Sequence, residues 1–219
     1  EVTGMFISGH PLDHFKFELE YYNVRSLRDY NEIAASDTLK SVNVHKPIRL
    51  AGLVTDAQHR VTKTGKNYGR LMIEDYSGNT ELVFWSEEYA RFRQFFELQY
   101  NLLITGSFQP RRRFNDSTDA VEYEFKVTNI LMLDTVKREL TKQVVLNIEA
   151  RFLNQEMVSF IERNVKSHPG KAGLRFNISE SKNKLKVGMY TMETGFEMND
   201  EMAAWLRDKP EVEVHVVTN

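Results

Sequence analysis

The sequence predicts an α+β protein that consists of an N-terminal helical segment, a small five-stranded β-barrel and a C-terminal α/β sandwich. Three observations support this division. Apolar residues recur at helical spacing near the start of the chain, β-type runs dominate its middle, and the two patterns alternate through its last third. We therefore expect domain boundaries at residues 1–42, 43–135 and 136–219.

The composition is that of an ordinary globular protein, with 41% hydrophobic and 27% charged residues in a chain of 219. Lys and Arg number 29 against 31 Asp and Glu, so the net charge is −2 and any nucleic-acid site must depend on a local cluster of cations. The absence of cysteine excludes disulfides and thiolate nucleophiles. No apolar run approaches the roughly 20 residues that a membrane helix needs, so we expect no membrane association.

The first 42 residues contain two candidate helices. Pro11 is suited to the first position of a helix, and apolar residues follow it at helical spacing, which predicts a helix over residues 11–22. A weaker pattern predicts a second helix over residues 27–35. Residues 37–46 are polar and predict no element. The chain begins at Glu1 without an initiator Met, so we expect it to be a piece of a longer polypeptide.

The middle segment contains five β runs and one helix. The predicted strands are residues 48–55, 68–75, 80–85, 101–109 and 123–133. A helix follows the third strand, and we expect Ser86 to cap it. Three strands, a helix and two strands are the order of an OB-fold, a five-stranded Greek-key barrel that binds oligonucleotides in many proteins.

The last segment has the order β-α-β-β-α-β. Its predicted elements are a strand at 144–148, a helix at 152–165, strands at 174–178 and 185–190, a helix at 198–206 and a strand at 212–217. This order is typical of a small α/β sandwich with its helices on one face.

Basic residues gather in two connections of the predicted barrel. The first hairpin carries four cations and contains no acid between residues 59 and 73. They are Arg60, Lys63, Lys66 and Arg70. The loop between the fourth and fifth strands carries Arg111, Arg112 and Arg113. Because these two connections flank one groove in an OB-fold, the sequence predicts a binding surface for a single-stranded nucleic acid.

Aromatic residues near these cations are candidates for stacking on bases. We expect Tyr68, Phe108 and Phe114 to supply flat faces, each worth about 1–3 kcal/mol per stacked base. Half of all strand positions in a barrel face inward, so Phe84, Trp85 and Phe108 are equally well explained as core residues. The charged loops likewise have an alternative explanation, which is solubility.

The sequence contains no pattern that predicts catalysis. His10 and His14 are four residues apart, but His10 precedes Pro11 and is expected outside the helix, so they predict no metal site. No phosphate-binding, nucleophile-elbow or zinc-protease motif occurs. We therefore expect a binding module with no catalytic residue, no metal and no cofactor.

Three strings resemble a known family. Gly4–Asp13 resembles the G-x-x-x-S-G-H-P-L segment of the bacterial replicative DNA polymerase III alpha subunit. Leu50–Val54 followed by Thr62–Gly69 resembles the opening of the OB domain in that family, and Ile73–Gly78 resembles its next strand and hairpin. The resemblance extends over essentially the whole chain, although the last 80 residues match by pattern more than by identity.

The resemblance implies a C-terminal fragment of the polymerase, with linker helices, the OB domain and a domain that binds the tau subunit of the clamp loader. Arg60, Lys63, Lys66 and Tyr68 of the first hairpin and Arg111–Arg113 match positions that face single-stranded template. The full-length parent is then a DNA-directed DNA polymerase, a cytoplasmic nucleotidyltransferase that uses Mg²⁺ in a domain upstream of this fragment. We expect the fragment to be monomeric, to need no cofactor and to contact other replisome subunits.

Two other functions remain open at this point. The barrel can be a protein-interaction module that binds no nucleic acid, in which case its groove should be apolar. It can also be the tRNA-binding OB module of a synthetase, although no synthetase motif adjoins it.

Overall fold

The computed structural model describes residues 9–111, 121–180, 185–190 and 195–218. The chain divides into two compact units. Unit 1 consists of residues 1–16 and 23–134, and unit 2 consists of residues 17–22 and 135–219. The domain boundaries expected from the sequence remain a prediction. None of the described helices is long and apolar enough to cross a membrane.

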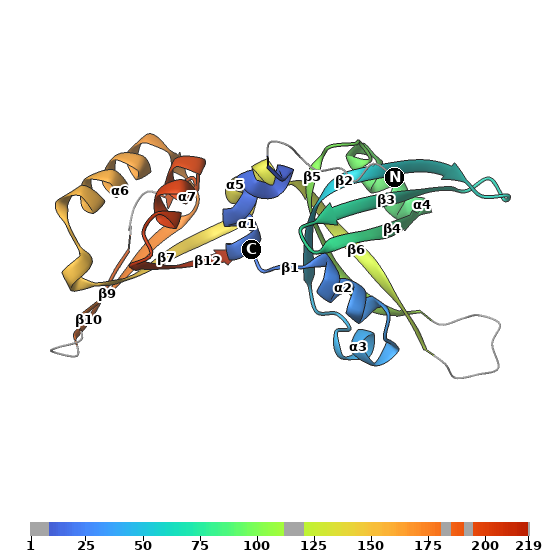
Figure 1. Ribbon diagram of the computed structural model, residues 1–219, viewed down its shortest axis with the longest axis horizontal. Helices are drawn as coiled ribbons and strands as arrows, with labels where there is room; N and C mark the ends of the chain where they lie inside the picture. The colour runs from blue at the N-terminus through green and yellow to red at the C-terminus, as the bar shows by residue number, and fades with distance from the viewer. Residues whose placement is uncertain (1–8, 112–120, 181–184, 191–194, 219) are drawn as a thin grey trace. The chain divides into compact units, whose positions relative to one another are not determined.

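The N-terminal segment forms three short helices after an initial 3₁₀ turn (Figure 1). The bounds are Pro11–Phe15 for the turn η1, Lys16–Tyr21 for α1, Leu27–Ala34 for α2 and Asp37–Val42 for α3. The helix expected over residues 11–22 is thus a 3₁₀ turn that continues into α1. Helix α3 was not predicted, because its polar sequence has no apolar face. It begins where the Ser36 hydroxyl accepts a hydrogen bond from the Leu39 amide at 3.3 Å.

A capping box explains the local conformation of the Gly-His-Pro-Leu-Asp string. The Nδ1 atom of His10 accepts a hydrogen bond from the Leu12 amide at 3.1 Å. The Asp13 carboxylate accepts the His10 amide at 2.9 Å and the Tyr76 hydroxyl at 2.7 Å. These bonds satisfy amide donors at the start of the turn and connect it to the β-sheet of unit 1.

Unit 1 is built on a curled antiparallel sheet. Its main strands are β2 (Ile48–Val61), β3 (Asn67–Asp75), β4 (Gly78–Trp85), β5 (Asn101–Arg111) and β6 (Glu122–Met132). Their order is β4-β3-β2-β5-β6, and the short β1 (Val24–Arg25) adds a parallel pairing to β2. This is the strand order of an OB-fold, as predicted. The described parts of β4 and β6 are not paired with each other, so the closed barrel that we expected is an open one.

Helix α4 (Ser86–Phe92) and the 3₁₀ turn η2 (Arg93–Phe95) follow β4 and close one side of the core. Phe92 and Phe96 are both 3% exposed and pack into the core. A Cβ atom at position 69 would collide with the Phe96 ring, which explains the glycine near the start of β3. The expected cap at Ser86 was wrong, because the N-cap residue is Trp85 and it makes no side-chain cap bond.

Helix α2 completes the core of unit 1. Its Tyr30 ring stacks on Phe108 with a centroid distance of 6.0 Å and meets Phe125 edge-on at 5.0 Å. The Leu27 amide at the start of α2 donates to the Asp75 carboxylate at 2.8 Å. An element from the N-terminal segment is therefore part of the same packed body as the β-sheet.

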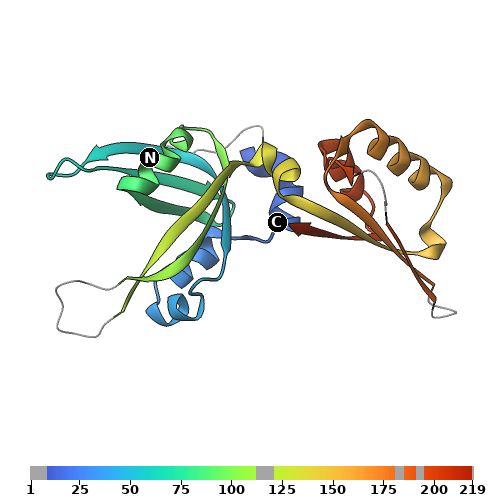
Figure 2. The same ribbon diagram turned by 180° about the vertical axis from the view of Figure 1, so that it is seen from behind.

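Unit 2 is a four-stranded sheet with both longer helices on one face (Figures 1 and 2). The elements are β7 (Thr141–Glu149), α6 (Gln155–Ser167), β9 (Gly173–Glu180), β10 (Leu185–Tyr190), α7 (Asp200–Arg207) and β12 (Val212–Thr218). The strand order is β10-β9-β7-β12, in which β7 and β9 are parallel and the other neighbours are antiparallel. The predicted β-α-β-β-α-β order is confirmed.

Several short elements in the last third of the chain carry too little periodicity to be predicted. They are helix α5 (Val136–Leu140), the turns η3 (Leu133–Thr135) and η4 (Ala150–Phe152), and the two-stranded pair β8 (Pro169–Gly170) and β11 (Gly195–Phe196). The β8–β11 pair explains the His-Pro-Gly string. A Cβ atom at position 170 would lie 2.6 Å from the Glu197 nitrogen, so only glycine permits this approach of two backbones.

A buried ion pair joins α1 to α5 in unit 2. The Lys137 ammonium donates to the Glu18 carboxylate, and these residues are 5% and 1% exposed. Lys137 also lies 3.0 Å from the Asp200 carboxylate, whose side chain is almost fully exposed. Because both charges of the main pair are removed from water, each depends on the other for compensation.

Loss of one partner should therefore destabilise unit 2 strongly. We expect Lys137→Met to lower the free energy of unfolding by about 3–5 kcal/mol, since Glu18 would remain buried without a counter-charge. The measurement is urea unfolding followed by Trp205 fluorescence in a Trp85→Phe background. Combining Lys137→Met with Glu18→Leu should restore part of the loss. A double variant as unstable as the sum of its single variants would contradict this account.

Candidate nucleic-acid interface

The outer face of β3 and β4 presents an aromatic pair. Arg60, Tyr68 and Trp85 form one lateral row across β2, β3 and β4. The Tyr68 and Trp85 rings are stacked, with centroids 4.9 Å apart and planes inclined by 21°. Trp85 remains 48% exposed, so its indole offers free aromatic surface beside Tyr68.

Strand alternation explains why Trp85 faces outward. Leu82 and Phe84 are buried in the core, so Val83 and Trp85 must point to the opposite side of β4. From the sequence alone, Trp85 could belong either to the core or to the surface. Adjacent strand residues cannot share a face, so the choice of Phe84 as the core residue would have assigned Trp85 to the surface.

Two lysines extend from the turn between β2 and β3. Lys63 and Lys66 are exposed, and neither forms an ion pair within the described part of the chain. The Thr62 amide donates to the Lys66 carbonyl at 2.8 Å, and Gly65 adopts a positive φ of 78° that the turn requires. A tight hairpin thus holds both ammonium groups at the tip of a long ribbon.

Most other cations of this region are already paired. The Arg70 guanidinium lies 2.8 Å from the Glu81 carboxylate on the neighbouring strand. Arg60 donates to the Gln58 side-chain oxygen at 2.9 Å. These contacts orient the two arginines along the outer face, and in the case of Arg70 they also neutralise its charge.

Arg111 reaches the same groove as Trp85. A groove of about 230 Å³ lies between β4 and β6, and its lining includes Trp85 from β4, Arg111 from β5 and Lys126 from β6. Arg111 lies 3.5 Å from the Glu124 carboxylate and is mostly exposed. The structure therefore brings Arg111 and the β3–β4 face together, although they are separated by a helix and a strand in the sequence.

A carboxylate bridges the open seam between β4 and β6. Glu88 accepts hydrogen bonds from the Val127 amide of β6 and from the Trp85 amide at the end of β4. Its side chain also lies 3.9 Å from the Lys126 ammonium. Burial raises the pKa of Glu88, and Lys126 and the two amides partly oppose that shift. Glu88 thus takes the place of backbone pairing across the seam.

Carboxylates limit where a phosphate can lie in this groove. Glu81, Glu88 and Glu124 line it together with Arg111 and Lys126. A phosphate inside the groove would meet like charge, whereas the indole of Trp85 offers a neutral face there. The arrangement favours a base in the groove and phosphates at its margins.

The structure gives the positions of some of the predicted site residues, and others lie outside its described part. Phe108 was wrong as a stacking residue, because it is 2% exposed and packs between Tyr30 and Phe125 in the core. Arg112, Arg113 and Phe114 lie outside the described residues. The roles of the remaining site residues stay a prediction. The β2–β3 hairpin and the ends of β5 and β6 extend toward the same side of unit 1 (right in Figure 1, left in Figure 2).

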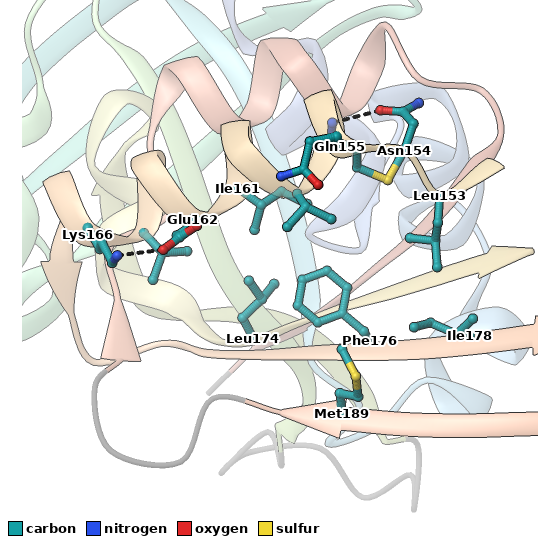
Figure 3. Close-up of a pocket in the computed structure, with 13 residues that line it drawn as sticks. Leu153, Asn154, Gln155, Ile161, Glu162, Lys166, Leu174, Phe176, Ile178 and Met189 are labelled. Carbon is teal, nitrogen blue, oxygen red and sulfur yellow. Dashed lines mark hydrogen bonds and ion pairs between the residues drawn. The ribbon is translucent and has the colours of Figure 1, made fainter. Parts of the chain in front are cut away.

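Unit 2 contains a second, apolar groove that the sequence analysis missed (Figure 3). Its volume is about 700 Å³, and it lies between α6 and the strands β9 and β10. Met157, Val158 and Ile161 form its helical wall, and Phe176 and Met189 lie on its sheet side. Its apolar lining makes it suitable for another protein. Among the described residues, no three His, Asp or Glu side chains are close enough to hold a metal ion.

The raised pKa of Glu88 predicts a pH dependence of stability. The Glu88 carboxyl stays protonated to a higher pH in the folded protein than in the unfolded chain. Its contribution to the free energy of unfolding therefore falls as pH rises from the unfolded-state pKa through the folded-state pKa. Relative to Glu88→Gln, the wild type should lose stability as pH rises above the ordinary pKa of a glutamate, about 4.3. The measurement is urea unfolding followed by Trp85 fluorescence in a Trp205→Phe background. The control is Glu87→Gln, because Glu87 lies on the same helical turn but is exposed. A stability difference between wild type and Glu87→Gln with the same pH dependence would contradict the assignment to Glu88.

Family models match a segment of each unit. Residues 48–133 match a family model described as the OB-fold nucleic acid binding domain. Residues 144–217 match the model of the DNA polymerase III alpha subunit, C-terminal domain. A small single-stranded DNA-binding protein from Streptomyces coelicolor aligns at 13% identity over 39% of this chain and 92% of its own, with a TM-score of 0.22.

Curated relatives match over most of the chain. DNA polymerase III subunit alpha of Escherichia coli (strain K12) is 22% identical over 170 residues, which are 77% of this chain and 13% of that protein. The subunit alpha of Borreliella burgdorferi is 26% identical over 202 residues, which are 86% of this chain and 15% of that protein. The chain therefore spans only a small part of the length of these relatives. By its sequence, the chain is homologous to the C-terminal region of the DNA polymerase III alpha subunit, which confirms the resemblance predicted from its motifs.

Proposed function

We propose that this chain is a non-catalytic part of a DNA polymerase III alpha subunit, in which unit 1 binds single-stranded DNA and unit 2 binds the tau subunit of the clamp loader. The parent protein is then a cytoplasmic DNA-directed DNA polymerase, and the groups that hold its Mg²⁺ lie outside this chain. The observation that carries the DNA-binding proposal is the exposed Tyr68–Trp85 stack between two sources of positive charge.

The aromatic pair supports the binding of an unpaired base. Tyr68 already covers part of the Trp85 indole, so a base that stacks on the remaining face extends an existing two-ring stack. Such stacking contributes about 1–3 kcal/mol per base and does not depend on base identity. A duplex cannot use this surface, because its bases are already stacked within the helix.

The cations at the margins support phosphate binding. Lys63 and Lys66 lie at the hairpin tip, and Arg111 lies at the start of the next connection. If roughly four such contacts form, the slope of log K against log salt is about −3 for a single strand. Binding would then weaken by roughly 50-fold between 50 and 200 mM salt. At high salt, the remaining affinity of the site for DNA should therefore come from base stacking.

The groove of unit 1 argues against a purely protein-binding barrel. Such a module should have an apolar groove, whereas the described lining includes Arg111, Lys126 and three glutamates. A groove with an apolar lining lies in unit 2. This distribution favours nucleic acid for unit 1 and protein for unit 2.

Removal of the indole should weaken DNA binding. We expect Trp85→Ala to reduce the affinity for a labelled oligothymidylate by roughly 5- to 150-fold, the equivalent of about 1–3 kcal/mol. Fluorescence anisotropy at low salt measures this change. The salt slope should stay the same, because stacking releases no counterions.

Tyr100→Ala is the matched control for Trp85→Ala. Tyr100 is 36% exposed and precedes β5, at the opposite end of that strand from Arg111. Its removal should leave the affinity within twofold of the wild type. Equal losses in the two variants, or no loss in Trp85→Ala, would contradict the placement of the DNA site.

The tau proposal is supported by the apolar surface of unit 2. Leu185, Val187 and Met189 lie on the helix side of β10 and are between 50% and 57% exposed. They continue the groove that α6 and β9 form. An apolar surface of this kind is typical of a protein-interaction site.

A charge in the groove should disrupt tau binding. We expect Val158→Glu to weaken capture of the tau subunit by more than about tenfold, because a partner would have to bury the new carboxylate. Surface plasmon resonance with purified tau subunit measures this. Val217→Glu, which places the same charge on an exposed position of β12, is the control. Unchanged tau binding by Val158→Glu would exclude the groove as the interface.

A further inference from the structure

We propose that the helix-free face of the sheet in unit 2 is a second binding surface for single-stranded DNA. On this face Tyr190 stacks on a base, and Arg175 and Lys186 bind phosphates. This inference goes beyond the proposed function, which places DNA on unit 1 alone.

The strand register places these three side chains on one face. Tyr190 lies opposite Arg175, and Lys186 lies opposite Ser179, in the antiparallel pair β9–β10. Asn177 is two residues from both Arg175 and Ser179, so it shares their face. The opposite face carries Phe176 and the other residues of the apolar groove beneath α6. Both α6 and α7 lie on that opposite face, so the polar face carries no helix (Figure 1).

An ordered chain of hydrogen bonds crosses this face. The Arg175 Nε donates to Asn177 Oδ1 at 3.0 Å, and Asn177 Nδ2 donates to Asn147 Oδ1 at 2.8 Å. Asn147 Nδ2 then donates to the Glu213 carboxylate at 2.9 Å. His215 lies 3.2 Å from the same carboxylate. The Asn147 hydrogen bond is the main cause that lowers the pKa of Glu213, and the neighbouring His215 adds to it.

This network holds the Arg175 guanidinium in one orientation. Ordering four polar side chains costs conformational entropy, and on an exposed sheet face they gain little stability in return. A Cβ atom at Gly188 would lie 3.8 Å from Arg175 Nη2, so the guanidinium lies above a position that has no side chain. Arg175 forms no ion pair within the described residues. An oriented guanidinium without a counter-charge is suited to bind a phosphate.

A hollow beside Arg175 has room for a ligand. Its volume is about 530 Å³, and Arg175, Lys186, Ser179 and Gly188 contribute to its lining. Lys186 likewise has no carboxylate partner among the described residues. Two cations and a hydroxyl therefore border one hollow, which matches the donors that a phosphodiester backbone accepts.

The aromatic residue favours DNA over an acidic peptide. Tyr190 is 63% exposed and lies opposite Arg175, so its ring can stack on an unpaired base while Arg175 and, further along β10, Lys186 bind phosphates of the same strand. An acidic peptide would use the cations but leave the ring exposed. The face also carries Glu149 and Glu213, but each already contacts a basic side chain, the Arg151 guanidinium at 2.7 Å and the His215 imidazole at 3.2 Å.

Photochemical cross-linking to the complete chain tests the proposal. The probe is an oligothymidylate of about 30 nucleotides, longer than the roughly 4–16 nucleotides that one OB-fold covers, with 5-iododeoxyuridine at several positions. Cross-linked peptides are identified by mass spectrometry. We expect a cross-link at Tyr190 in the wild type, at least a fivefold loss of it in Arg175→Gln, and retention in Trp85→Ala.

Matched variants separate the surface from the fold. Both Tyr190 variants are made in a Trp85→Ala background and compared with Trp85→Ala alone. Tyr190→Phe should retain the affinity for the oligonucleotide, whereas Tyr190→Leu should lower it at least fivefold. Arg207→Gln removes a positive charge from α7 and should leave the affinity for the oligonucleotide unchanged. Circular dichroism confirms that each variant is folded.

The outcomes distinguish the two DNA proposals. A cross-link at Trp85 or Tyr68 without one at Tyr190 would overturn this inference and leave the proposed function intact. A cross-link at Tyr190 alone would support this inference and contradict the site on unit 1. Binding of polyglutamate that depends on Arg175, without a DNA cross-link at Tyr190, would show that the face binds acidic peptides and would also overturn the inference.

Discussion

The unpaired seam between β4 and β6 determines the site of unit 1. Two strands that lack mutual hydrogen bonds leave backbone donors exposed, and the Glu88 carboxylate satisfies one on each side of the seam. The same gap leaves space for the groove in which Trp85 and Arg111 meet. A fully paired barrel would bring β4 and β6 to backbone hydrogen-bonding distance and remove this groove. The departure from a closed barrel is therefore what creates the candidate interface.

Charge pairing decides which cations of unit 1 are available to a ligand. Arg70 is held by Glu81 at 2.8 Å, and Arg111 lies at a longer distance of 3.5 Å from Glu124, whereas Lys63 and Lys66 at the hairpin tip have no carboxylate partner among the described residues. A chain with a net charge of −2 can thus present positive potential only where the fold separates cations from acids. The hairpin achieves this by extending beyond the acidic residues of the sheet. Stacking on Trp85 then supplies an attraction that counterions do not screen.

Unit 2 has two chemically different faces on one sheet. The helix side of β10 is apolar and partly uncovered, since Leu185, Val187 and Met189 are between 50% and 57% exposed. The other side carries the hydrogen-bonded row from Arg175 to Glu213. Side chains alternate along each strand, so a single hairpin can supply an apolar surface to a protein and a polar surface to a different ligand.

The sequence by itself determined the order of strands and helices, because periodicity and turn residues are local properties of the chain. It also determined that the cations of the first hairpin lie together, because a tight turn keeps residues that are close in the sequence close in space. Only the tertiary structure decided that Phe108 is a core residue and Trp85 a surface residue, because their burial depends on α2 and on the seam. The hydrogen-bond network from Arg175 to Glu213 could not be predicted from the sequence either, since its residues come from three strands whose register arises only when the sheet forms.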